Sequence, residues 1–92
     1  MIKSFRHKGL ERFFRKSDRR GIQAQHASRV ERILSLLDEA SSPEQLTIPG
    51  LFLHPLKGER KGEWAMTVSG NWRITFRFDG EDVIVVNLED YH

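Results

Sequence analysis

In Trp72-Arg73-Ile74-Thr75-Phe76-Arg77-Phe78, apolar and polar side chains alternate along the whole segment. A period of two is the signature of a β-strand, in which successive side chains point to opposite faces. The apolar set is therefore expected to face a core, and the two arginines to project from the other face. Turn sequences flank the stretch at Ser69–Asn71 and at Asp79–Gly80, so its neighbours are expected to be antiparallel strands.

The same period of two extends outward from this stretch, back to residue 51 and on to residue 88. It predicts strands at residues 51–57, 64–68, 72–78 and 83–88, with a loop at 59–62. Residues 1–5 alternate as well and predict a further short strand. The second half of the chain is thus expected to form one sheet whose strands are joined by tight turns.

Before residue 50 the apolar spacing is that of helices. Apolar side chains at positions 10, 13 and 14 predict a first helix over about residues 7–17, with His7 exposed near its start. A stripe over Ile22–Leu37 predicts a longer second helix, and His26 at its edge is interpreted as a structural residue. Ser42–Gln45 resembles the capped start of a helical turn, with proline in the first helical position.

Together these elements predict an α+β fold, with two N-terminal helices packed on one face of a small, mainly antiparallel sheet. Ninety-two residues suit a single domain over residues 1–92. No apolar run is long enough to span a membrane, and the first residues lack the apolar core of a signal peptide, so a cytoplasmic protein is expected. The absence of cysteine excludes disulfides and thiolate zinc sites.

Positive charge is concentrated at the start of the chain. The formal net charge is only +2, yet residues 1–20 hold eight Lys or Arg against two acids, whereas residues 79–92 hold five acids and no Lys or Arg. This asymmetry suits a polyanionic partner that meets the basic parts, although a set of solvated helix faces is the alternative. The residues expected to dock on such a partner are Arg12, Arg15, Lys16, Arg19 and Arg20.

Arg73 and Arg77 form the first candidate constellation. Two guanidinium groups about 7 Å apart on one sheet face suit phosphate groups, which they can hold through bidentate hydrogen bonds. Arg73, near the start of its strand, is the favoured phosphate ligand, and Arg77 is interpreted as structural or solvated. The alternative is that both are surface arginines paired with acids across the sheet.

His54-Pro55-Leu56-Lys57-Gly58 is the second constellation. His54 can act as a general base near neutral pH, and Lys57 supplies a compact charge for a phosphate. A purely structural role for His54 is the alternative.

The third constellation is Asp90-Tyr91-His92, which follows the predicted final strand. A carboxylate, a phenol and an imidazole at the end of a rigid strand are candidates for proton transfer, and a solubilising polar cap is the alternative. A metal site made by His54, Asp90 and His92 is disfavoured, because no His-x-x-x-His or Glu-x-x-His pair is present. No cofactor is expected.

With these segments in view, the chain resembles the HigB toxins of bacterial toxin–antitoxin pairs, within the RelE/ParE superfamily. Residues 17–50 match loosely. The resemblance spans the whole chain and is strongest at Met1–Phe5, Leu53–Gly58, Asn71–Phe76 and Glu89–His92.

The resemblance implies a RelE-like microbial ribonuclease fold and an endoribonuclease that cuts messenger RNA at the ribosome. It also implies a cognate HigA-like antitoxin with a helix-turn-helix domain. The toxin would then bind operator DNA only as part of its complex with that antitoxin. The family's active-site positions fall on His54, Lys57, Arg73, Asp90, Tyr91 and His92.

Metal-free RNA cleavage gives those six residues consistent roles, because it needs a base for the 2′-hydroxyl, cations for the phosphorane and an acid for the leaving oxygen. Asp90 or His54 is the expected base, Lys57 and Arg73 hold the phosphate, and His92 is the acid. Tyr91 is expected to stack on or orient a nucleotide. The basic first helix is expected to dock on ribosomal RNA, or else to contact the antitoxin.

Two rival functions stay open at this point. ParE-like members of the superfamily share the fold but poison DNA gyrase, and they lack the terminal histidine set. A non-catalytic RNA-binding or corepressor module explains the basic patches but leaves His54 and the tail without a purpose.

Overall fold

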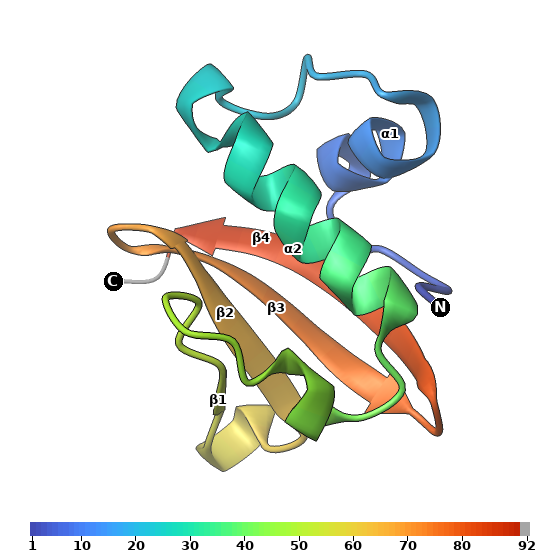
Figure 1. Ribbon diagram of the computed structural model, residues 1–92, viewed down its shortest axis with the longest axis vertical. Coiled ribbons are helices and arrows are strands. Elements are labelled where there is room, and N and C mark those ends of the chain that lie inside the picture. The colour runs from blue at the N-terminus through green and yellow to red at the C-terminus, as the bar shows by residue number, and fades with distance from the viewer. Residues whose placement is uncertain (91–92) are drawn as a thin grey trace.

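The computed structural model describes residues 1–90 and places two helices on one face of a four-stranded antiparallel sheet (Figure 1). The strands lie in the order β1 (His54–Pro55), β2 (Glu63–Ser69), β3 (Trp72–Asp79) and β4 (Asp82–Asp90). The helices are α1 (Lys8–Lys16) and α2 (Ala27–Glu39), and short 3-10 turns occupy Ala24–His26 (η1), Pro43–Leu46 (η2) and Gly58–Arg60 (η3). The predicted α+β fold class is confirmed.

The alternation of β3 builds the core as predicted. Ile74 and Phe76 are fully buried, and Trp72 and Phe78 pack against the same cluster. From the helix side α2 contributes the stripe Val30, Ile33, Leu34 and Leu37. Burial of each such side chain stabilises the fold by about 1.5–3 kcal/mol, so this face of the sheet is the main source of stability.

A bulge in β4 changes which residues of that strand point into the core. The register against β3 shifts between Thr75 and Arg77, and Val85 adopts a left-handed backbone with φ of 50°. Because of this extra residue, Val83 and Val86 both point into the core although three positions separate them.

The N-terminal segment lies beside β4 but is not the continuous strand that its alternation predicts. Ile2 and Phe5 form isolated parallel bridges with Val83 and Val86. At the bulge between these bridges, the backbone N–H of Val85 donates to the Ser4 hydroxyl at 2.9 Å instead of to a carbonyl. The bulge therefore interrupts the backbone ladder, and a side chain replaces the missing partner.

His7 is half-buried and caps α1, so the expectation that it is exposed is wrong. Its Nδ1 accepts from the N–H of Leu10 at 3.0 Å, which satisfies a donor that the first helical turn leaves free. The second helix begins at Ala27 and not near Ile22, although Ile22 is still buried. His26 is buried too, with its ring centroid 5.6 Å from that of Trp72, which agrees with a structural role.

The strand predicted at 51–57 is shortened to two residues, because Phe52 has a left-handed backbone with φ of 52°. Leu51 nevertheless remains part of the core and accepts the N–H of Thr67 at 2.8 Å. The predicted helical turn at 42–45 is present as η2 with Pro43 in its first turn. Ser42 makes no side-chain cap there.

Candidate active site

The face of the sheet away from the helices, called the outer face below, carries Arg73 and, by strand register, His54. Its centre is set by Arg73, Thr75 and Arg77 of β3, which alternate with the core residues. The register places Arg73 between Thr67 of β2 and Glu89 of β4. Thr75 lies two residues further along β3, in register with Ala65 of β2 and, through it, with His54 of β1. Two strand spacings and two residues along the strand separate the α-carbons of His54 and Arg73 by roughly 12 Å, so both side chains can approach one phosphate group.

His54 is held in a defined ring orientation. Its Nδ1 lies 2.9 Å from the carbonyl oxygen of Phe52, and a carbonyl can only accept, so Nδ1 carries the hydrogen in this arrangement. In the neutral ring this leaves Nε2 as the proton acceptor. The tautomer favoured by this hydrogen bond leaves His54 able to act as a base. The residue is half-buried, so it is still partly exposed to solvent.

Arg73 is held by backbone carbonyls at the β2–β3 turn. Its Nη1 donates to the carbonyl oxygens of Gly70 at 2.7 Å and Trp72 at 3.2 Å. Arg77, by contrast, donates to the Lys61 carbonyl at 3.1 Å, and its guanidinium lies against Gly62. Arg77 therefore holds the loop before β2, which agrees with its structural interpretation.

A carboxylate network lies between these arginines and is absent from the sequence-based predictions. Arg60 donates to Glu63 at 2.8 and 3.2 Å and to Glu89 at 2.6 and 2.9 Å, so one guanidinium bridges β2 and β4. Thr75 and Asn87 also donate to Glu89. The hydrogen bonds from Arg60 lower the pKa of both glutamates, and both remain ionised at neutral pH.

This network was missed because its partners are far apart in the sequence. Arg60 and Glu89 are separated by 29 positions, and nothing local marks the pair. Its effect on the outer face is electrostatic: the single guanidinium of Arg60 offsets one of the two carboxylate charges that would otherwise repel a phosphate. Arg29 of α2 was missed for the same reason, and it donates to the carbonyl of Gly50 in the loop before β1.

Lys57 and Asp90 lie toward opposite ends of the sheet. Lys57 is exposed at the start of η3, where it lines a pocket of about 370 Å³ together with Lys61 and Trp64. Asp90 is the last described residue of β4, exposed and opposite Trp72, in the row beyond Arg73 and Glu89. Tyr91 and His92 lie outside the described residues.

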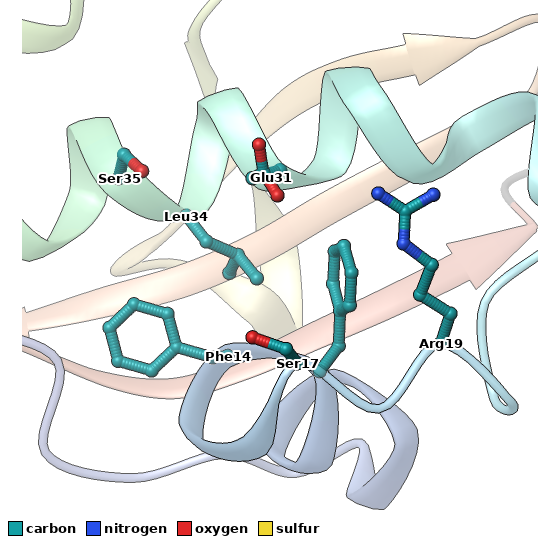
Figure 2. Close-up of a pocket in the computed structure, with 7 residues that line it drawn as sticks. Phe14, Ser17, Arg19, Glu31, Leu34 and Ser35 are labelled. Carbon is teal, nitrogen blue, oxygen red and sulfur yellow. The ribbon is translucent and has the colours of Figure 1, made fainter.

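The five predicted docking residues are all exposed and lie on the helix side of the molecule. Figure 2 shows Arg19 beside a pocket of about 310 Å³ between α1 and α2, with Glu31, Leu34 and Phe14 also in its lining. Arg15 pairs with Glu11 at 3.3 Å, and Arg20 pairs with Asp18 at 2.7 Å. The basic helix and the outer face are therefore two separate surfaces, divided by the core.

Within residues 1–90, no group of three or more His, Asp or Glu side chains is placed to hold a metal ion. The disfavoured set that joins His54 and Asp90 to His92 includes a residue outside this range. No helix in the described part of the chain is long and apolar enough to cross a membrane.

Two helices on a four-stranded antiparallel sheet form the α+β fold that is also found in bacterial toxins. A solved structure of a YoeB/ParE toxin from Agrobacterium tumefaciens shares this fold, with a TM-score of 0.58 and 16% identity over 97% of this chain and 99% of that one. Within the class, residues 3–92 match the family described as RelE-like toxin of type II toxin-antitoxin system HigB, and the chain belongs to that family. It is also similar to the Endoribonuclease HigB of Proteus vulgaris, with 47% identity over 92 residues and full coverage of both chains. The predicted family is confirmed.

Proposed function

We propose that this chain is a ribosome-dependent endoribonuclease that cuts messenger RNA during translation. Membership of the family makes the chain an endoribonuclease toxin of a type II toxin–antitoxin pair, as its sequence predicts. The observation that supports this proposal is the outer face, where an oriented imidazole and a guanidinium held by backbone carbonyls lie on the same side of the sheet. Arg60 offsets one of the two carboxylate charges between them.

The reaction is transesterification within the RNA strand. A base removes the proton of a 2′-hydroxyl, the resulting oxygen attacks the adjacent phosphorus, and the bond from phosphorus to the 5′-oxygen breaks. An acid delivers a proton to that leaving oxygen. The products are a 2′,3′-cyclic phosphate and a 5′-hydroxyl, and the balance needs neither a water molecule nor an oxidant.

The residues take roles that follow from their chemistry. With Nδ1 of His54 donating to the carbonyl of Phe52, Nε2 of the neutral ring is the proton acceptor, so His54 or Asp90 is the base. Arg73 and Lys57 stabilise the charge that develops on the phosphorane oxygens. His92 is the acid, and Tyr91 stacks on or orients a nucleotide.

The ribosome contributes by holding the messenger RNA in line for attack, which lowers the catalytic demand on so small a protein. Arg12, Arg15, Lys16, Arg19 and Arg20 dock on ribosomal RNA from the helix side, and association weakens steeply with salt. The family implies an antitoxin. We propose that it is HigA-like, with a helix-turn-helix domain through which alone the toxin meets operator DNA, and that the single-domain toxin acts in the cytoplasm.

The test is messenger RNA cleavage in a reconstituted translation system, mapped by primer extension. Cuts are expected at codon-spaced positions in the presence of ribosomes, and they should disappear when ribosomes are omitted. His92→Ala and Arg73→Ala should abolish them, with Arg77→Lys as the matched control. Folded, antitoxin-free protein that makes no cuts would overturn the proposal, and gyrase inhibition in the same preparation would point to the ParE-like activity.

A further inference from the structure

The loop before β1 presents an aromatic ring to solvent beside the candidate active site. Among residues 1–90, the large apolar side chains that remain exposed are Met1 and Phe52, and Phe52 is the more exposed of the two at 68%. Exposure of a single apolar residue is ordinary in a protein surface. What distinguishes Phe52 is the backbone that carries it and the residues around it.

The backbone at Phe52 is in the left-handed region, with φ of 52°, which L-residues other than glycine rarely adopt. Its two neighbours explain why it turns outward, since Leu51 is fully buried and Leu53 packs against the same core. The ring is therefore held outward on a strained backbone, at a position where glycine or asparagine would be easier to accommodate.

The loop that carries Phe52 is fastened at several points. Arg29 of α2 donates to the carbonyl of Gly50, and also to the carbonyl of Thr67 at 3.3 Å. Leu51 accepts the N–H of Thr67 at 2.8 Å, and the carbonyl of Phe52 itself holds Nδ1 of His54 at 2.9 Å. A loop tied to a helix, a strand and a candidate base is a rigid support for a side chain that contacts a ligand.

The position of the loop places Phe52 at the edge of the site. The hydrogen bond between Leu51 and Thr67 brings the loop into the row that contains Arg73 and Glu89. In Figure 1 this loop lies at the same end of the sheet as the β2–β3 turn and the end of β4. Two strand spacings, about 10 Å, separate the loop from the strand that carries Arg73.

We propose that Phe52 is a stacking platform for an unpaired nucleobase of the RNA, next to the phosphate held by Arg73. Single-stranded RNA is bound by side chains that stack on splayed bases, and a phenylalanine ring offers such a surface whatever the base. The loop that carries the ring lies two strands from Arg73, so an RNA strand whose phosphate lies on Arg73 can stack a neighbouring base on the ring. This inference rests on the proposed endoribonuclease function.

The experiment replaces Phe52 and measures RNA binding and cleavage on programmed ribosomes. Binding is measured with a messenger RNA that carries a 2′-deoxy nucleotide at the cut site and so cannot react. Phe52→Trp and Phe52→Tyr should bind as the wild type does or more tightly. Phe52→Leu keeps apolar bulk without a π-face, and Phe52→Gly removes the ring while relieving the backbone strain. Both should weaken binding by roughly 5- to 150-fold, the range for loss of one stacked base.

Thr47→Ala, an exposed residue earlier in the same loop region, is the matched control and should change nothing. Because Phe52→Gly suits the local backbone, its loss of RNA binding cannot be attributed to misfolding, and an unchanged thermal midpoint checks this. Wild-type affinity for Phe52→Leu or Phe52→Gly would overturn the inference, and weaker antitoxin binding with unchanged RNA binding would instead make the ring a protein contact. If the wild type cuts no RNA, the proposed function is wrong. If the wild type and all Phe52 variants cut RNA equally, only the stacking role of Phe52 is wrong.

Discussion

The inner and outer faces of the sheet are built by different kinds of interaction. The inner face is an apolar layer in which Ile74 and Phe76 meet the stripe of α2, and each contact is non-directional and large in area. The outer face is held by directional, charged hydrogen bonds from Arg60 and Arg73. The two faces of one sheet therefore differ in the interactions that hold them, with apolar burial on one side and charged hydrogen bonds on the other.

The largest expected effect is on the inner face. Phe76→Ala removes a fully buried ring from the middle of β3 and should lower the free energy of unfolding by about 3–5 kcal/mol. Urea denaturation followed by circular dichroism measures this change. Cleavage should fall only in proportion to the unfolded fraction. A variant that kept full stability would show that the core does not depend on this layer.

The next effect, of similar size, should be purely catalytic. Arg73→Ala removes the cation expected on the phosphorane and should lower the cleavage rate by about 10²–10³. The unfolding free energy should change by about 1 kcal/mol, the usual net contribution of hydrogen bonds such as those that Arg73 donates to the carbonyls of Gly70 and Trp72. Single-turnover cleavage and urea denaturation of the same preparation separate the two quantities. If Arg73→Ala lowered the unfolding free energy by as much as it raised the barrier to cleavage, the outer face would contribute to stability as the inner face does.

Arg60→Met tests whether the outer face also contributes stability. The change removes the guanidinium partner of Glu63 and Glu89, although the Arg60 side chain is 34% exposed and the loss is partly screened. A destabilisation of about 1–3 kcal/mol at pH 7 is expected. Cleavage should fall as well, because two uncompensated carboxylates then face the RNA backbone.

The pH dependence of the unfolding free energy provides a control for Arg60→Met. Both glutamates have a pKa below the ordinary value of 4.5 in the folded state, so their contribution is complete above that pH and is lost as pH falls through the lowered values. The difference between wild type and Arg60→Met should therefore shrink between pH 5 and pH 3. A difference that stayed constant over this range would show that the loss is one of packing and not of charge.

The sequence predicts the inner face almost completely, and the outer face only in part. Period-two alternation identifies β3 and its core residues, because local sequence determines which face a side chain occupies. The same pattern places Arg73 on the outer face. It cannot reveal Arg60, since the pairing with Glu89 depends on how the chain returns across the sheet. Nor can it reveal the left-handed backbone at Phe52, which ends the strand expected over 51–57.

The smallest expected effect is on the cap of α1, which belongs to neither face of the sheet. His7→Ala removes the acceptor for the N–H of Leu10 and should cost about 0.5–1 kcal/mol, whereas His7→Asn should restore part of it. Burial lowers the pKa of His7 from its ordinary 6.5, so the cap stabilises the fold above that pH and is lost as pH falls through the lowered value. The wild type should therefore lose this increment on acidification toward pH 5, while His7→Asn should not. Because α1 lies on the helix side, neither variant should alter the cleavage rate per folded molecule. A change in that rate would mean that α1 and the outer face are coupled through the core, and that the division of labour between the two faces is incomplete.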